Sequence, residues 1–230
     1  MRVLGVYVFG SVSRGDFDSS SDIDVLIVYK SSASQALRAR TRAAVIEVLG
    51  KQCTFAEYSL QRLKDFFSRG HLFAWHLFLE AKALDVPLLE IGGHVIFDRP
   101  KPYTQSIADA GDFARLLRST LQNVGAGTPS LVFEAGIAYL ALRNIGMCLS
   151  PRVMGHPVFT RLAPFSVSAA LGLAPPIEEA YYQRLAAARH ASQRGGDAPT
   201  FHRERLLFQL QAADRWSVEV IEKASEKFVA

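Results

Sequence analysis

Cysteine is scarce in this chain of 230 residues, which contains only Cys53 and Cys148. The two lie far apart in the sequence. This argues against a disulfide framework and against a metal site built from cysteines. A reducing, cytoplasmic setting is the simplest expectation.

Long apolar runs are also missing. The longest that we identify, around Leu72–Leu79, contains His76 and is closed by Glu80, well short of the about 20 apolar residues that a membrane-spanning helix needs. The apolar opening Val3–Phe9 runs directly into Gly10, which fits a first strand better than a signal peptide. We therefore expect no membrane segment.

Lysine and arginine form no long basic run. They outnumber the acidic residues by 26 to 22, which gives a formal net charge of +4, but they are scattered along the chain. This balance is compatible with a phosphate-rich partner such as a nucleotide or RNA, and it does not identify a nucleic-acid surface. The apolar and charged fractions, 49% and 21%, are those of ordinary globular proteins, so the chain can bury a sizeable core.

The first hundred residues alternate between strand and helix patterns. Val3–Phe9 and Ile23–Tyr29 are short apolar runs rich in β-branched and aromatic residues, which predicts two buried strands. Helical spacing over Ser34–Leu49, stopped at Gly50, predicts a helix. Further along we predict a strand at Gln52–Tyr58, helices at 59–69 and 72–83, and an edge strand or hairpin at 86–97.

Two prolines among charges in Asp98–Pro102 indicate a domain boundary. Beyond it the apolar period is helical, with segments near 105–124, 131–149, 157–171, 177–192 and 201–228. We therefore predict an α+β protein: a small sheet domain at residues 1–98, followed at 104–230 by an all-α bundle of four or five helices.

Two carboxylates open the second predicted strand. Because side chains alternate across a strand, Asp22 and Asp24 project to one face, while Ile23 and Val25 project to the other, into the core. Two like charges side by side are costly, and a bound divalent cation is the cheapest way to keep both ionised. Ligand sets made only of oxygen favour magnesium or manganese. The alternative is a pair of surface residues that cap the strand.

The turn before these aspartates suits a phosphate. Gly10 allows close approach of the backbone, and Ser11 and Ser13 offer hydroxyl and main-chain donors. Arg14 could add a charged contact. A nucleoside triphosphate held there would present its α-phosphate to the metal, so that an acceptor hydroxyl could attack in line and pyrophosphate could leave. An ordinary turn and an ordinary surface charge are the alternatives.

The turn, the Ser-rich loop and the paired aspartates occur together between two strands. In residues 10–16 and 20–27 this run resembles the signature of the DNA polymerase β-like nucleotidyltransferase superfamily. Among its branches the run is most similar to the minimal nucleotidyltransferases and the kanamycin nucleotidyltransferase group. The resemblance covers about residues 3–29 in motif and about residues 1–98 in layout.

This resemblance implies a small mixed sheet flanked by helices, Mg²⁺ (or Mn²⁺) held by Asp22 and Asp24, and transfer of a nucleotide, usually adenylate from ATP, to an acceptor. It also implies a third carboxylate on a later strand, acting as base or as an extra metal ligand. Glu57 is the one acid of the third predicted strand and is the candidate, although it lies nearer the strand end than the family's acid usually does. A solvent-facing Glu57 is the alternative.

The helical half resembles the HEPN family in the run Tyr139–Asn144. RNA-cleaving members have a histidine a few residues after the arginine, which this chain lacks after Arg143, so we expect no ribonuclease activity. We expect residues 104–230 to bind the acceptor or a partner. A small molecule, a protein hydroxyl and a tRNA end all stay open as acceptors, as does a homodimer. The alternative function is a catalytically degenerate nucleotide-binding or interaction module, such as an antitoxin-like partner protein.

Overall fold

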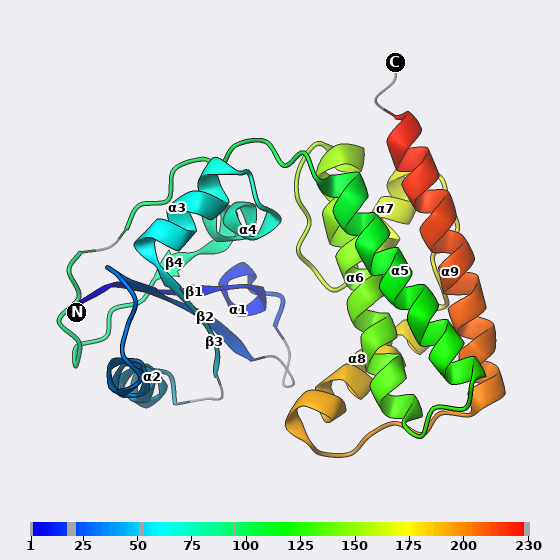
Figure 1. The fold of residues 1–230 in the computed structure, drawn as a ribbon, viewed down its shortest axis with the longest axis horizontal. Helices are drawn as coiled ribbons and strands as arrows, with labels where there is room; N and C mark the ends of the chain where they lie inside the picture. The colour runs from blue at the N-terminus through cyan, green and yellow to red at the C-terminus, as the bar shows by residue number, and fades with distance from the viewer. Residues whose placement is uncertain (1, 18–21, 51–52, 94, 228–230) are drawn as a thin grey trace. The chain divides into compact units, whose positions relative to one another are not determined.

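The protein is described by a computed structural model that covers residues 2–17, 22–50, 53–93 and 95–227. The chain divides into two compact units, residues 1–104 and 105–230. The first contains a four-stranded mixed sheet with helices, and the described part of the second contains helices and no strand (Figure 1). The predicted α+β class is confirmed. The predicted domain limits, 98 and 104, stay a prediction.

The sheet has the strand order β3-β2-β1-β4. Its central strand β2 runs antiparallel to β1 and parallel to β3, while β4 pairs antiparallel with the far side of β1. The bounds of the strands are β1 Val3–Phe9, β2 Ile23–Tyr29, β3 Cys53–Ser59 and β4 Lys82–Ala83. The first two have the bounds that the sequence predicted; the predicted start of the third, Gln52, lies outside the described residues.

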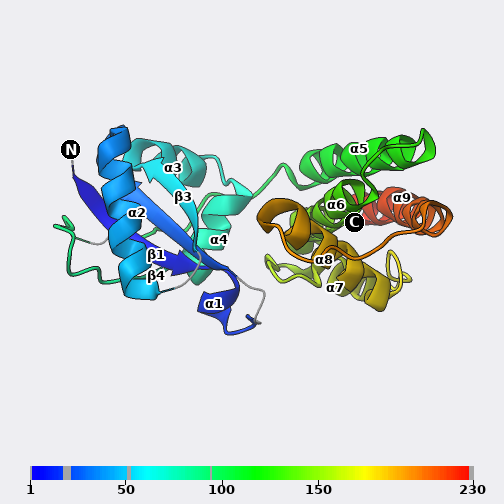
Figure 2. The same cartoon turned by 90° about the horizontal axis from the view of Figure 1, so that it is seen from below.

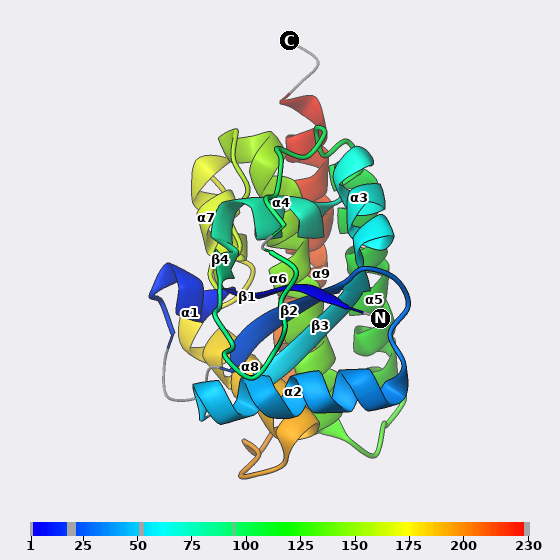
Figure 3. The same cartoon turned by 90° about the vertical axis from the view of Figure 1, so that its left-hand side faces the viewer.

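Helix α2 (Gln35–Leu49) covers one face of the sheet (Figure 3). It begins where the Ser34 side chain accepts a hydrogen bond from the Leu37 amide, and it ends at Gly50, which has a φ of 59°. Its buried side of Ala44 and Val45 packs on a cluster from β1 and β2 that comprises Val3, Val6, Ile23, Val25, Ile27 and Tyr29. Apolar burial therefore fixes which side of β2 faces this helix.

Helices α3 (Leu60–Ser68) and α4 (Leu72–Glu80) cover the opposite face (Figure 3). The Ser59 side chain caps α3 by accepting from the Arg62 amide. Leu63 of α3 and Leu77 of α4 pack on the alternate residues of the two central strands, Tyr7, Phe9, Leu26 and Val28.

The predicted edge strand or hairpin at 86–97 is wrong. The described residues of that segment form only one isolated bridge, from Val3 to Ile91. The edge strand beside β1 is instead β4, whose residues 82–83 the sequence predicted as the end of the helix at 72–83. Pro87 lacks an amide hydrogen and Gly92–Gly93 has no side chains to pack, which disfavours a continuous ladder.

The second unit consists of helices whose bounds are α5 Ser106–Gly125, α6 Leu131–Met154, α7 Ala163–Ala170, α8 Glu179–Arg194 and α9 Arg203–Glu226. Figures 1 and 2 both show α5 beside α6 and α9, with which it packs. Helix α6 also packs against α7, α8 and α9 and is the core helix of this unit.

By length and composition α6 could cross a membrane, and more than half of its most apolar stretch is buried inside the unit. Among the described residues, α6 is the one helix that meets this test, whereas the apolar run that we identified from the sequence, Leu72–Leu79, is shorter. The helix also continues past its predicted end at Leu149, because its last turns stay packed through Ser150 and Val153.

Gly146, in the middle of α6, allows close contact with the backbone of α7. A Cβ there would lie 2.4 Å from the Pro164 nitrogen and 2.6 Å from the Ala163 carbonyl carbon. Backbone atoms cannot swing aside as a flexible side chain would, so we expect Gly146→Ala to lower the free energy of unfolding by about 1–3 kcal/mol. Thermal and urea unfolding of the purified protein would measure this change.

Gly111→Ala in α5 is the matched control for that variant. A Cβ at Gly111 meets nothing nearer than Arg115 Nη1 at 3.7 Å. Replacing a helical glycine in open space should raise stability by up to about 1 kcal/mol. Equal effects of the two substitutions would contradict the close packing of α6 on α7.

Candidate active site

Asp22 and Asp24 lie at the start of β2, at one end of the sheet. Asp24 pairs with Phe9 of β1 and with Thr54 of β3, so it lies on the face covered by α3 and α4. Asp22, two residues earlier, is held by a hydrogen bond of 2.8 Å that the Thr54 hydroxyl donates to its Oδ2. The residue between them, Ile23, belongs to the core on the α2 face. The two carboxylates are therefore at the same end of the sheet and on the same side.

Gly10 ends β1 and lies directly against Asp24. Its φ of 75° and ψ of −151° fall in a region that is essentially restricted to glycine. A Cβ on Gly10 would lie 2.4 Å from Asp24 Oδ2. The turn and the second aspartate, which the sequence separates by 14 positions, are thus in direct contact, and only a residue without a side chain permits it.

The chemistry of these donors fits a divalent cation that is shared with a substrate. Among the described residues no group of three or more His, Cys, Asp and Glu side chains is arranged to hold a metal ion. Mg²⁺ in proteins is commonly bound by one or two carboxylates, with phosphate and water oxygens in its other positions. Asp22 and Asp24 supply the two carboxylates that such an arrangement requires.

The residues predicted to bind phosphate form the turn and the short helix α1 (Ser11–Arg14). Three of them are tied to one residue, Glu80 of α4. The Gly10 amide donates to Glu80 Oε2 at 3.1 Å, Arg14 Nη1 donates to the same oxygen at 2.7 Å, and Ser13 Oγ donates to the Glu80 carbonyl at 2.5 Å. Arg14 also pairs with Asp16 at 3.1 Å.

Sequence reasoning did not find Glu80 as a site residue. It treated this position only as the end of an apolar stretch. One signal was present: an acidic residue closes an otherwise apolar helix, four positions after His76 and on the same helical side. A carboxylate that such a helix buries must find donors, because an unpaired buried charge is costly.

The Ser-rich loop of the motif, residues 18–21, lies outside the described residues.

Glu57 is not brought to the aspartates, which corrects the prediction that it is the third carboxylate. It pairs in register with Ile27 of β2, so it lies on the α2 face of the sheet, opposite to Asp24. There it forms ion pairs with Arg42 and, at 3.5 Å, with Arg38, both on α2. The β3 residues on the Asp24 face are Thr54, Ala56 and Tyr58, and none of them is acidic.

The partners of Glu57 set its charge. Burial raises the pKa of Glu57, but hydrogen bonds from Arg42 and Tyr29 and the charges of Arg42 and Arg38 outweigh it and hold the pKa below its ordinary value of 4.5. Burial raises the pKa of Tyr29 to about 12, and both the hydrogen bond to Glu57 and the negative charge of Glu57 add to this rise. Glu57 is therefore an ionised structural carboxylate that ties β3 to α2.

Cys53 opens β3 beside the aspartates and is not part of a disulfide. Burial, and then the charge of Asp22, raise the pKa of the Cys53 thiol. The thiol is thus protonated near neutral pH, which does not suit a metal ligand or a nucleophile.

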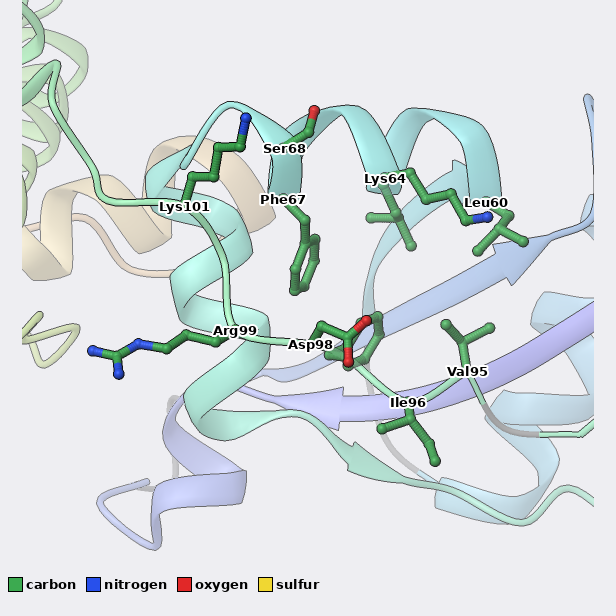
Figure 4. A pocket seen from close by; sticks show the side chains of 11 residues that line it. Leu60, Lys64, Phe67, Ser68, Val95, Ile96, Asp98, Arg99 and Lys101 are labelled. Carbon is green, nitrogen blue, oxygen red and sulfur yellow. The ribbon is translucent and has the colours of Figure 1, made fainter.

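A pocket of about 320 Å³ lies elsewhere in this unit, between α3 and residues 95–101 (Figure 4). Phe67 points into it from α3, and its ring stacks on Phe97 with 5.4 Å between centroids and 16° between planes. The side chain of Arg99 points away from it in Figure 4. None of the predicted site residues lines this pocket, and we do not assign it to the nucleotide.

Residues 2–69 match the family model of the nucleotidyltransferase domain. The match spans β1 to α3 and includes the turn and both aspartates. No curated protein shows a significant match to the chain. The N-terminal part of the chain is therefore a nucleotidyltransferase domain, and the resemblance noted from the sequence is confirmed. Helix α4 and the whole second unit lie outside the matched residues.

Gly10→Ala tests the contact between the turn and Asp24. The new Cβ would force Asp24 Oδ2 away. The alanine would also have to adopt a backbone conformation that alanine avoids. We expect a loss of stability of about 1–3 kcal/mol and at least about tenfold weaker binding of Mg²⁺ with ATP. Unfolding by urea and calorimetric titration would measure the two effects.

Gly15→Ala provides the control, because Gly15 also has a positive φ, 85°, but a Cβ there would meet nothing within 4 Å. It should cost about 1 kcal/mol of stability and leave nucleotide affinity within about twofold. If both variants lowered the affinity equally, backbone strain in the turn rather than contact with Asp24 would be the cause.

Glu57→Gln tests the reassigned glutamate. Near neutral pH we expect it to lower the free energy of unfolding by about 1–3 kcal/mol while nucleotide binding is kept. Since the folded pKa is lowered, the ionised form contributes stability above pH 4.5, and this contribution is lost as the pH falls through the folded value. The difference between wild type and variant should therefore shrink in acid, as urea unfolding at several pH values would show.

Glu47→Gln is the control, because Glu47 is exposed on α2. Its stability should stay within about 0.5 kcal/mol of wild type at each pH. Loss of nucleotide binding in Glu57→Gln, in a protein that stays folded, would restore Glu57 to the active site.

Proposed function

We propose that this protein transfers a nucleoside monophosphate, with adenylate from ATP as the first candidate, to an acceptor hydroxyl and releases pyrophosphate. The observation that carries the proposal is the contact of Gly10 with Asp24. It joins the phosphate-binding turn to the aspartate pair within a segment that matches the nucleotidyltransferase domain. Neither half alone would distinguish the site from an ordinary turn or from a pair of surface acids.

Each part of the site has a role in this reaction. Asp22, oriented by Thr54, and Asp24, held against Gly10, would bind Mg²⁺ or Mn²⁺. The cation would offset negative charge on the phosphates as the leaving group departs. The Ser11 hydroxyl and the main chain of the turn would donate to the triphosphate.

The transfer itself makes one bond and breaks one. The acceptor oxygen bonds to the α-phosphorus, the bond from that phosphorus to the α,β-bridging oxygen breaks, and pyrophosphate takes the electron pair. The hydroxyl proton passes to a base. Glu57 is not that base, because it lies across the sheet from the aspartates and is neutralised by two arginines.

The acceptor is proposed by class only. We propose that the helical part of the chain, residues 104–230, recognises it, and a small molecule, a protein hydroxyl and a tRNA end all carry a suitable oxygen. A homodimer, in which a second copy of the chain contributes residues to the acceptor site, also stays open.

The double substitution Asp22→Asn with Asp24→Asn tests the proposal. Asparagine keeps an oxygen but loses the charge that a hard cation needs, so ATP affinity in the presence of Mg²⁺ should fall by at least about 100-fold. The variant should stay folded without metal, because it also removes the repulsion between two neighbouring carboxylates. Calorimetric titration of ATP with Mg²⁺ and with chelator, alongside thermal unfolding, measures both.

Asp85→Asn with Glu90→Gln changes the charge equally at exposed positions and should bind as wild type does. Failure of the folded wild type to bind any nucleoside triphosphate with Mg²⁺ or Mn²⁺ would refute the proposal. Binding of the triphosphate without release of pyrophosphate in the presence of any acceptor class would instead favour a nucleotide-binding interaction module.

A further inference from the structure

We infer that Glu80 is a positioning residue of the nucleotide site, which holds the turn Gly10–Arg14 in the shape that receives the triphosphate. The inference rests on the proposed function and adds a residue to it. Glu80 lies outside residues 2–69, the part of the chain that matches the nucleotidyltransferase domain.

Three groups converge on a single oxygen of this side chain. Glu80 Oε2 accepts from the Gly10 amide at 3.1 Å and from Arg14 Nη1 at 2.7 Å, and His76 Nε2 lies 2.8 Å from it. The Glu80 side chain is only 8% exposed. Removing a carboxylate from water is costly, and this cost is offset only where donors are fixed around it. The cluster is therefore a built feature of the fold rather than a surface ion pair.

The main chain near Glu80 holds the same turn. Ser13 Oγ donates to the Glu80 carbonyl at 2.5 Å, and Lys82 Nζ donates to the Ser13 carbonyl at 2.6 Å. The turn is thus bonded at its beginning, through Gly10, and at its end, through Ser13 and Arg14. All of these bonds come from the end of α4 and the strand that follows it.

The turn needs such bonds because its apolar packing is slight: Val12, its one apolar side chain, is only partly buried against the core cluster of the α2 face. Helix α1 has four residues, none of them buried, and no side chain caps its start. Elsewhere in this unit each helix buries at least one residue against its neighbours. The affinity for triphosphate and the rate of transfer both depend on donor positions to within about 0.5 Å. A turn without a fixed support would therefore bind triphosphate poorly.

The same geometry gives Arg14 a different role from the one that its sequence position predicts. Its guanidinium is engaged by Glu80 and Asp16, and its side chain is 20% exposed. Arg14 therefore acts through Glu80, as part of the support of the turn, rather than as a direct phosphate ligand.

The experiment compares Glu80→Gln with wild type in two titrations of the full chain. Titration of ATP with Mg²⁺ reports the turn and the aspartates together. Titration of Mn²⁺ alone, followed by its paramagnetic resonance signal, reports the aspartates. Because one charged hydrogen-bond acceptor is lost, we expect the ATP dissociation constant to rise by about tenfold or more. The Mn²⁺ affinity should stay within about twofold of wild type. Glu90→Gln, at an exposed position, should change neither.

A spectroscopic readout ties the effect to the turn. The Gly10 amide proton should exchange more slowly with solvent in wild type than in Glu80→Gln, and its resonance should shift between the two proteins. A general loss of stability would instead change exchange across the whole unit.

Arg14→Gln supplies an independent variant if Glu80→Gln unfolds. It removes the second charged partner and should also weaken ATP binding about tenfold. If both single variants fold, combining them should weaken binding no further, since both act on one support. Additive effects would show that Arg14 contacts phosphate directly, and would overturn the shared role.

Unchanged or tighter ATP binding in folded Glu80→Gln, with wild-type binding intact, would overturn the inference and leave the proposed function standing. Tighter binding would mean that the Glu80 carboxylate competes with phosphate for the Gly10 amide. Absence of triphosphate binding in wild type would refute the proposed function, and the role of Glu80 with it.

Discussion

The alternation of side chains along β2 is the constraint on which the N-terminal unit depends. This strand is hydrogen-bonded on both sides, and Val25 and Ile27 must face α2 because they complete its core. With that face fixed, Asp24 can only lie on the other face, beside the end of β1. A slip of one residue would exchange the two sets, bury Asp24 under α2 and separate it from the turn.

The acids of this unit are held in different ways, which separates structural from chemical roles. Glu57 of β3 forms ion pairs with Arg38 and Arg42 of α2. Glu80 of α4 forms an ion pair with Arg14 of the turn. These pairings stabilise the scaffold. Asp22 and Asp24 are placed together at the end of a strand, where their mutual repulsion favours a cation. Under the proposed function, the charge that neutralises these two carboxylates arrives with the substrate.

The limits of sequence prediction follow from particular residues. The two central strands and α2 have clear apolar runs and stop signals at Gly10 and Gly50, and the structure gives them nearly the predicted bounds. The segment 86–97 also contains β-branched residues but pairs at only one isolated bridge, because pairing depends on a partner strand that composition does not reveal. Glu57 was assigned to the site by its place in the chain, although its side depends on a parallel register that no local pattern specifies.

The sequence by itself determined the class of chemistry. Gly10, Ser11, Asp22 and Asp24 lie in one short segment, and their spacing across two strands is a local property that alternation makes readable. Only the tertiary structure decided which distant residues contact this segment. Glu80 reaches the turn from 70 positions away, through an amide donor and an arginine, and Glu57 is removed from the site by the register of β3 on β2. Contacts between distant segments depend on how layers pack, and that information is spread over the whole core rather than written beside either residue.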